Sequence, residues 1–458
     1  MPPISSQCIS IGVATPPAAL DFNANRHTRS ILPRFAWIYA ILVATAVLAL
    51  ADLTGAFVAP LEHPAIQYPT RPATGPVADL NHRLQEGQIH LQFNGPSGYL
   101  RSVLDALRVP VESQMLVFSK TSFQAERITP RNPRSLFFND SVVVGWVPGG
   151  DILELAAADP RQGVIFYVLD NRVVAQPRFI RRDDKCLQCH ESYSTLGVPG
   201  MILLSVYPDA YGMPMFAAGT FVTDHRSPVE QRWGGWYVTG DSGSTRHLGN
   251  AAFVDPANPR PLTPKPSRNP NSLRNRIDTT GYLSPYSDIA ALLVFEHQVR
   301  MVNLLTRVGW EIRYALYEEQ RGTVNHDFTV RRVRETTNEI VDYLLFVDEA
   351  PLDGKTRGSS GFAEIFAAAG PFDHQGRSLR QLDLEQRLLR YPCSYMLYSP
   401  AFDALPRESK DAIYQRLWQV LSGEESSPRY ARLSHRDRQA IIEILRDTKP
   451  DLPRSYFR

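Results

Sequence analysis

Cysteine is scarce in this sequence, with four residues in a chain of 458. A disulfide scaffold would need a far higher density, so that class is excluded. An excess of charge of one sign is also lacking, because 49 Lys and Arg stand against 47 Asp and Glu, for a formal net charge of +2. This balance gives no electrostatic argument for a nucleic-acid partner. With 43% hydrophobic residues, the chain can bury a core, and wholesale disorder is excluded.

Long apolar runs are lacking except for one near the N-terminus. It covers residues 35–51 and, continued through Asp52, reaches Ala59. A membrane-spanning helix needs ~20 residues, so the uncharged run alone is marginal and its continuation makes it long enough. Arg26, Arg29 and Arg34 precede this run, and no Lys or Arg lies between Asp52 and Thr70. The positive-inside rule therefore predicts a cytoplasmic tail over residues 1–34 and a body on the outer side of the membrane.

Two interpretations of this run both predict export. Trp37 and Tyr39 resemble interfacial anchors and favour an uncleaved transmembrane segment over residues 35–59. Ala49-Leu50-Ala51 instead fits a signal-peptidase site. We expect a protein of the bacterial inner membrane with its main body in the periplasm, or a soluble periplasmic protein after cleavage. A buried helix of a soluble protein is the third alternative.

The remaining chain divides by pattern into four parts. Residues 60–113 are rich in Pro and predict a tether followed by a short helix, and residues 114–255 predict a β-rich domain. Residues 256–285 contain seven prolines, and this density predicts a linker. Residues 286–458 predict a helical region that packs on the β-rich domain. The expected fold class is therefore α+β.

Short apolar runs separated by turn residues predict an antiparallel meander. Its expected strands cover residues 142–147, 151–155 and 164–169, and further strands are expected at 215–222 and 236–238.

Helical periodicity governs the second half of the chain. Six residues recur at steps of three and four and form one apolar stripe: Val294, His297, Met301, Leu305, Val308 and Ile312. A second helix ends at Gly423, and Ser434 with Asp437 predicts a capping box that opens the last helix.

One motif carries recognisable chemistry, the sequence Cys186-Leu187-Gln188-Cys189-His190. C-x-x-C-H is the attachment sequence for c-type haem. Two thiols at this spacing add to the two vinyl groups of one porphyrin, and the next histidine binds the iron as the proximal ligand. In bacteria this attachment takes place outside the cytoplasm, so the motif and the predicted export agree. We expect one covalent haem c held by Cys186, Cys189 and His190.

Three other uses of the motif are open. A zinc site would need further ligands and usually a second C-x-x-C, which the chain lacks. A thioredoxin-like pair would be expected beside a βαβ pattern. A plain disulfide would have no need of the histidine.

Five other segments are distinctive: Phe138-Asn139-Asp140 through Gly150, Thr223-Asp224-His225-Arg226-Ser227-Pro228, Arg232-Trp233-Gly234-Gly235-Trp236-Tyr237, Arg246-His247-Leu248-Gly249-Asn250 and Tyr391-Pro392-Cys393-Ser394-Tyr395. Together they resemble a bacterial family whose members are described only as cytochrome c domain-containing proteins. The likeness covers roughly residues 115–250 and 286–406. It implies haem at the C-x-x-C-H motif and no particular substrate. Unlike the small all-helical cytochromes c, this chain is expected to flank the motif with strands.

A six-coordinate haem needs a second axial ligand, most often Met or His. The downstream candidates are Met201, Met213, Met215, His225, His247, His297, Met301 and Met396. We rank His247 first, because it lies in a Gly- and Ser-rich loop that could close over a flat cofactor. His297 ranks second, because the apolar stripe turns it inward. Each has a plainer alternative, a solvated loop histidine and a hydrogen-bonded core histidine, respectively.

The sequence thus predicts an exported, membrane-anchored mono-haem cytochrome that passes single electrons to an unidentified redox partner protein. One alternative is a haem enzyme with an open distal site, of a peroxidase-like or small-ligand-converting kind. Another is a haem-based sensor or interaction module. Electron transfer is favoured over catalysis, and a nucleic-acid partner is not expected.

Overall fold

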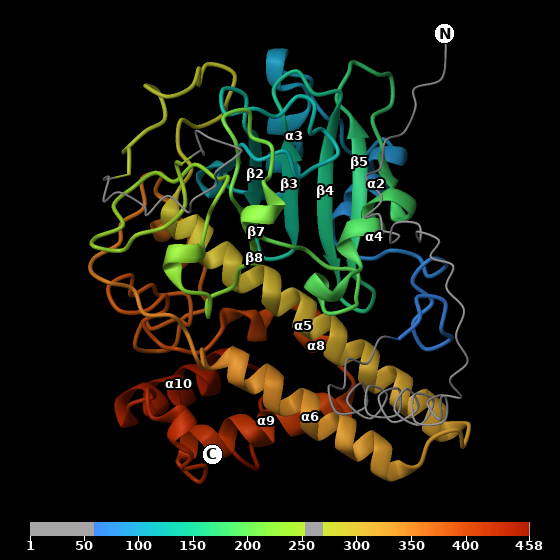
Figure 1. Cartoon of the computed structure of the whole chain (residues 1–458). Coiled ribbons are helices and arrows are strands. Elements are labelled where there is room, and N and C mark those ends of the chain that lie inside the picture. The colour runs from blue at the N-terminus through green and yellow to red at the C-terminus, as the bar shows by residue number, and fades with distance from the viewer. Residues whose placement is uncertain (1–58, 252–268, 458) are drawn as a thin grey trace, which may run out of the picture. The chain divides into compact units, whose positions relative to one another are not determined.

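The computed structural model describes residues 59–251 and 269–457, which belong to one compact unit that begins at Phe57. A six-stranded antiparallel sheet is followed along the chain by a mainly helical region (Figure 1). The predicted α+β class is confirmed at this level. The predicted tail, and the predicted transmembrane segment apart from Ala59, lie outside the described residues.

The sheet is a meander in which each strand pairs with the next. Its strands are β1 (Met115–Val117), β2 (Arg134–Phe138), β3 (Val142–Trp146), β4 (Ile152–Asp159), β5 (Gly163–Asp170) and β6 (Phe179–Arg181). β3, β4 and β5 confirm the three strands of the predicted meander. Their register places Val143, Ala156 and Phe166 opposite one another.

Residues 59–107, which precede the sheet in the chain, cover one of its faces. Three residues of β4 point to that face and are buried: Leu153, Leu155 and Ala157. The helices α2 (Pro76–Gln85) and α3 (Leu100–Leu107) contribute to the same core cluster. The predicted tether therefore packs on the sheet through Ile66, Tyr68, Val77 and Leu80 and does not extend away from it. Tyr68 is completely buried, and its hydroxyl donates to the carbonyl of Val164 at 2.8 Å.

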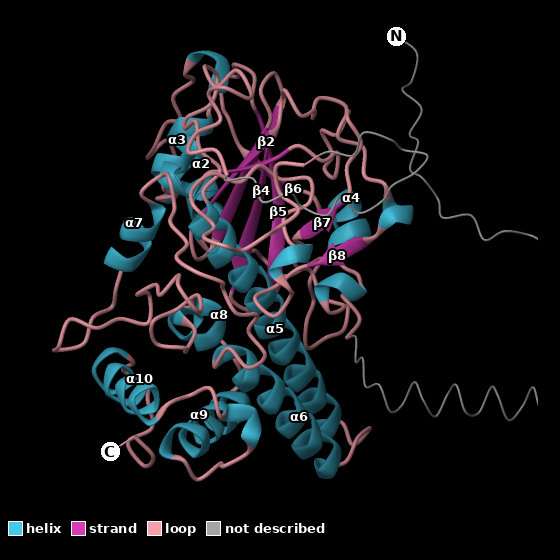
Figure 2. Cartoon of the chain, turned by 60° about the vertical axis from the view of Figure 1, so that its left-hand side comes forward, coloured by secondary structure: helices cyan, strands magenta, loops and turns pink. Residues whose placement is uncertain are grey.

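The long helix α5 (Ile289–Gln320) contributes to the core on the opposite face (Figures 1 and 2). Its N-terminus is capped by Asp288, whose carboxylate accepts hydrogen bonds from the amides of Ala290 and Ala291. By length and composition α5 could cross a membrane, yet 94% of its most apolar window is buried inside the protein. A core helix of a soluble protein has the same properties.

Five further α-helices follow α5 within the described residues. They are α6 (His326–Leu344), α7 (Phe362–Ala368), α8 (Pro400–Asp403), α9 (Arg407–Ser422) and α10 (His435–Thr448). α6 packs against both α5 and α9. Gly423 ends α9 with a left-handed φ of 88°, and Ser434 and Asp437 form the capping box of α10, both as predicted.

Two predicted strands are wrong in whole or part. Within residues 215–222 only β8 (Thr220–Val222) is extended, paired with β7 (Leu204–Val206), because a turn of 3₁₀ helix precedes it. Residues 236–238 form no strand, since Gly235 turns the chain with a φ of 85° and only an isolated bridge joins Trp236 to the sheet.

Short 3₁₀ helices cover Gly95–Ser97, Val111–Ser113, Tyr193–Thr195, Phe216–Ala218, Val229–Gln231, Tyr395–Tyr398 and Pro428–Tyr430.

The described end of the predicted linker packs against the sheet domain. Leu273 and Ile277 are buried in a small core cluster with Phe118 and Tyr237.

Candidate functional site

The whole C-x-x-C-H motif lies on one short helix, α4 (Asp183–His190), which follows β6 directly. On a helix, residues three and four apart share a face, so Cys186, Cys189 and His190 are neighbours on α4. α4 packs against β5. Strands do flank the motif helix along the chain, with β6 directly before it and β7 after a turn of 3₁₀ helix, while the motif itself is helical.

His190 is held in one tautomer by a backbone carbonyl. Its Nδ1 lies 2.9 Å from the carbonyl oxygen of Gly200, and since a carbonyl only accepts, Nδ1 carries the proton. The lone pair of a neutral ring is then on Nε2. Burial lowers the pKa of His190 below its ordinary value, which favours that neutral form. The ring packs against Phe166, with centroids 4.6 Å apart.

The position of Gly200 is fixed in turn by α5. Asn303, which is buried, accepts a hydrogen bond from the amide of Met201 at 3.0 Å and donates one to the carbonyl of Met201 at 2.8 Å. A Cβ on Gly200 would lie 2.3 Å from the side-chain oxygen of Asn303. Gly200 and Asn303 belong to the candidate site, and the sequence analysis did not single them out.

The two motif cysteines differ in exposure and are not joined to each other. Cys186 is buried and Cys189 is exposed, and both are free thiols. Burial raises the pKa of Cys186 to about 11, so its thiol stays protonated near neutral pH. Among the described residues, no group of three or more His, Cys, Asp and Glu side chains is placed to hold a metal ion.

The sheet face next to α4 is only partly covered. Residues of β4 alternate between full burial on one face and partial exposure on the other. The partly exposed set is Ile152, Glu154, Ala156 and Ala158. Glu154 pairs with Arg134 at 2.8 Å, and both charges act on the pKa of His190. Ala156 and Ala158 pack against the main core cluster, which also contains Cys186. The surroundings of the motif are therefore apolar, as a c-type haem would require, and Cys186, Cys189 and His190 are the donor set that such a haem would use.

His247, the first-ranked distal candidate, lies in a buried part of its loop. It is 8% exposed, its ring packs edge-on against Trp233 at 4.9 Å, and its Nδ1 accepts from the amide of Gly249 at 3.0 Å. Burial lowers its pKa to about 4. These contacts fix the ring of His247 among residues of its own loop and of the segment around Trp233.

His297 is fully buried, as the apolar stripe predicts, and both ring nitrogens are hydrogen-bonded. Its Nδ1 lies 2.8 Å from Nδ1 of His225, and its Nε2 lies 2.7 Å from Oγ of Ser394. The ring stacks on Tyr343 and Phe346. Burial lowers the pKa of His297 to about 3. In this arrangement neither nitrogen is available to an iron atom.

A buried ion pair borders this histidine pair. Arg232 and Glu296 meet at 2.9 Å with almost no exposure of either side chain. Arg232 also donates to the carbonyl of His225 at 3.0 Å. The sequence places Glu296 and His297 on one helix, but it holds no signal for a partner 64 residues earlier in the chain.

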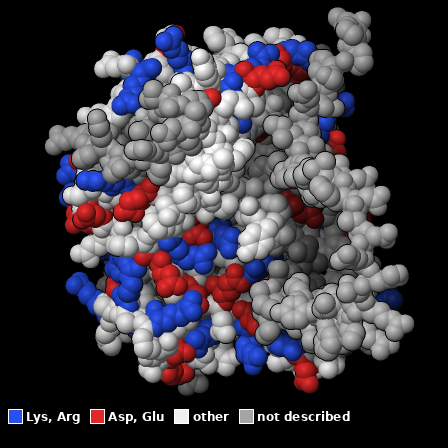
Figure 3. All heavy atoms as spheres, viewed as in Figure 1, with Lys and Arg blue, Asp and Glu red and all other residues white. Residues whose placement is uncertain are grey.

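The methionine candidates are dispersed. Met301 and Met396 are buried in the main core, and Met201 contacts the site through its backbone. Met213 is 46% exposed. It belongs to an exposed apolar set on and before β8 that also contains Tyr211, Phe216 and Val222. Figure 3 shows a surface without Lys, Arg, Asp or Glu where Figure 1 draws β7 and β8.

Comparison with protein-family models, with curated proteins and with solved structures finds no match for this chain. The resemblance to cytochrome c domain-containing proteins therefore stays a prediction.

Proposed function

We propose that this protein is an exported c-type cytochrome that carries single electrons on one haem attached to α4. The observation that carries the proposal is the geometry of His190. Its Nδ1 proton is donated to the carbonyl of Gly200 at 2.9 Å, which leaves Nε2 for the iron, the arrangement that metal-binding histidines generally adopt.

Each residue of the site has a distinct role in this proposal. Cys186 and Cys189 hold the porphyrin through thioether bonds, and His190 supplies the proximal ligand. Gly200 fixes the tautomer and orientation of the imidazole, and its hydrogen bond increases the basicity of Nε2. A bound haem supplies reversible one-electron chemistry, whose potential depends on the axial ligands, burial and nearby hydrogen bonds.

The other uses of the motif have less support. A structural zinc ion takes four ligands, and among the described residues no group of three or more His, Cys, Asp and Glu side chains is placed to hold a metal ion. A redox-active cysteine pair needs a lowered thiol pKa. Thioether attachment needs no thiolate in the finished protein.

A haem enzyme with an open distal site is the second candidate, and the surroundings of the two ranked histidines favour it. His247 is packed in its loop against Trp233, and His297 uses both nitrogens in hydrogen bonds. If neither reaches the iron, the haem keeps a position for a small ligand. Binding of CO or cyanide to the untreated protein, without loss of a protein ligand, distinguishes this candidate from a carrier of electrons alone.

The cellular location that we propose for the haem-bearing body is inferred from the sequence. We propose that residues 35–59 anchor the chain in the bacterial inner membrane, that the haem-bearing body lies in the periplasm, and that a redox partner protein reaches it there.

The test is visible spectroscopy of the full chain, produced with export and haem attachment in a bacterial host. We expect a c-type spectrum and haem that remains on the polypeptide in a denaturing gel. Cys186→Ala combined with Cys189→Ala should abolish the covalent haem.

Cys393 provides the matched control, because it is a buried free thiol on a different segment. Cys393→Ala should retain the haem. A wild-type protein without covalent haem, or one whose haem survives the double substitution, would refute the proposal.

A further inference from the structure

A cavity of about 180 Å³ lies in the helical region and is built from residues other than those of the motif helix. Three segments line it: the turn after α6, the loop before Cys393, and the stretch between α9 and α10. Its size is below the range of roughly 300–1,000 Å³ that drug-sized ligands occupy. It therefore suits a small ion.

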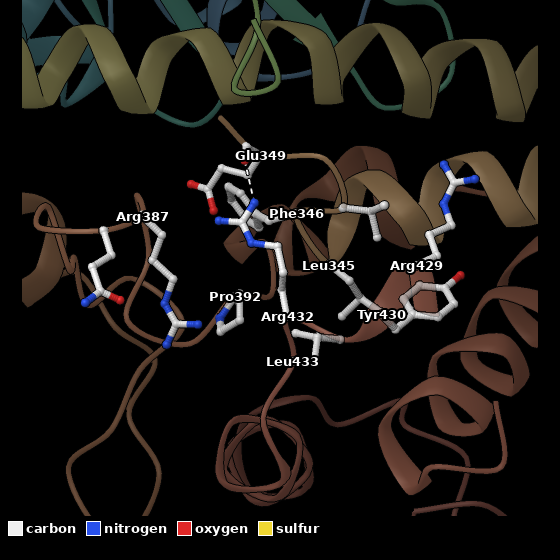
Figure 4. A pocket seen from close by; sticks show the side chains of 11 residues that line it. Leu345, Phe346, Glu349, Arg387, Pro392, Arg429, Tyr430, Arg432 and Leu433 are labelled. Atoms are coloured by element: carbon white, nitrogen blue, oxygen red, sulfur yellow. Dashed lines mark hydrogen bonds between the residues drawn. The ribbon is translucent and has the colours of Figure 1, made fainter. Parts of the chain in front are cut away.

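Arginine is the dominant polar residue of the lining. Arg387, Arg429 and Arg432 contribute guanidinium groups, and Glu349 contributes the only carboxylate of the lining. Figure 4 shows Glu349 and Arg432 beside each other, with Arg387 to one side and Arg429 farther away on the other.

The three arginines differ in whether an acidic side chain pairs with them. Arg387 is paired with Asp437, at 2.9 Å, and Arg429 is paired with Asp342, at 3.0 Å. Neither aspartate lines the cavity, so each orients its guanidinium from outside. Within residues 59–251 and 269–457, Arg432 forms no ion pair, and one of its nitrogens donates to the backbone carbonyl of Glu349.

Glu349 is buried, with an exposed fraction of 6%, and its carboxylate is fixed by a hydrogen bond. Its Oε1 accepts a hydrogen bond from the amide of Leu388 at 2.8 Å. The turn that carries it contains two residues with left-handed backbones, Phe346 (φ 55°) and Asp348 (φ 61°). A bulky residue such as Phe346 rarely adopts this conformation, and such strain is concentrated at functional sites.

We propose that this cavity is a binding site for inorganic phosphate, held by Arg432 and Arg387, with Glu349 accepting a hydrogen bond from the protonated oxygen of the anion. Guanidinium groups match the oxygens of phosphate in geometry and charge. A buried carboxylate would repel an oxyanion that has no proton to donate. The site should therefore prefer hydrogen phosphate over sulfate at pH 8, where sulfate carries no proton.

Titration calorimetry on the purified full chain at pH 8 tests this, with phosphate, sulfate and methyl phosphate as separate probes. Wild type should bind phosphate at least about tenfold more tightly than sulfate or methyl phosphate, since a hydrogen bond to a charged group gives a factor of about ten or more. Glu349→Gln should remove that preference. Arg432→Gln should weaken phosphate binding about tenfold or more.

Arg436→Gln is the matched control. Arg436 is exposed, lies four positions after Arg432 and is not part of the lining, so its loss should leave phosphate affinity within about twofold. Equal weakening by both arginine substitutions would identify general charge attraction and overturn the proposal. So would the absence of phosphate binding up to about 10 mM, or equal binding of phosphate and sulfate by wild type. Thermal unfolding of each variant verifies that it is folded.

Discussion

His190 and Gly200 are joined by two hydrogen bonds that run in opposite directions. The imidazole Nδ1 of His190 donates to the carbonyl of Gly200, and the amide of Gly200 donates to the carbonyl of His190, each at 2.9 Å. The end of α4 and the segment that follows it are thereby closed into one rigid loop. The imidazole of His190 cannot rotate without losing its hydrogen bond to the carbonyl of Gly200.

Gly200→Ala should destabilise the protein, because the added methyl group has no space. Its Cβ would lie 2.3 Å from Oδ1 of Asn303 and 3.1 Å from Cβ of Thr195. Overpacking of this kind costs about 1–3 kcal/mol. Urea unfolding followed by circular dichroism measures the loss. Gly281→Ala is the control, since nothing lies within 4 Å of its Cβ position. An equal effect of both substitutions would show that the close contact is not the cause.

Asn303→Ala should destabilise the segment between His190 and Met201, because Asn303 holds the end of that segment against α5. Asn303 makes both side-chain hydrogen bonds to the backbone of Met201, and each buried group left without a partner costs about 1–3 kcal/mol. If His190 is the proximal ligand, the haem reduction potential should shift as well, because the Gly200 carbonyl loses its support. Redox titration of the purified protein measures that shift.

Thr306→Val is the matched control for Asn303→Ala. Thr306 lies on the same helix, and its hydroxyl donates to the carbonyl of Val302 within that helix. We expect a loss of stability without a change in potential. A potential that moves equally in both variants would indicate a general effect of destabilising α5.

Local patterns in the sequence predict most of the regular structure. β3, β4 and β5 are short apolar runs between turns, and α5 follows an unbroken stripe at steps of three and four. The motif on α4 is equally local, because its chemistry depends on five consecutive residues. His297 is buried, as its place in the stripe predicts.

Contacts between distant segments are not predictable from these patterns. Asn303 meets Met201 across 102 residues, and His297 meets His225 across 72. The loop of His247 contains Gly and Ser and suggests flexibility, yet packing against Trp233 buries the histidine. In each case tertiary packing determines the environment of a side chain whose local sequence is uninformative.

If α4 carries the proposed haem, replacement of either ranked distal histidine should leave the spin state of that haem unchanged. His297 contacts His225 and Ser394 through its two nitrogens, so His297→Ala should cost about 2–4 kcal/mol of stability through lost packing and hydrogen bonds. His297→Gln retains a polar side chain if the alanine variant does not fold. Visible spectra of both variants and of His247→Ala measure the result. A low-spin haem that becomes high-spin in one variant would identify that histidine as the sixth ligand.

Glu349 should make the folded state less stable as pH rises. Burial is the main cause that raises the pKa of Glu349 in the folded protein to about 7, from an ordinary value of 4.5. Between these values the folded state holds a proton that the unfolded state has released, so the free energy of unfolding falls as pH increases. The stability of wild type relative to Glu349→Gln should therefore decline between pH 5 and 7, by at most about 1.4 kcal/mol per unit.

Urea unfolding at several pH values measures this slope, in buffers without phosphate or sulfate so that anion binding does not contribute. Glu385→Gln is the control, because Glu385 is an exposed carboxylate that pairs at the surface with Lys355. Its difference from wild type should stay nearly constant over the same range. If the difference for Glu349→Gln is also constant, the carboxyl group of Glu349 does not titrate between pH 5 and 7 in the folded protein. The cavity would then contain a permanently charged glutamate, and anion affinity should not increase as pH falls.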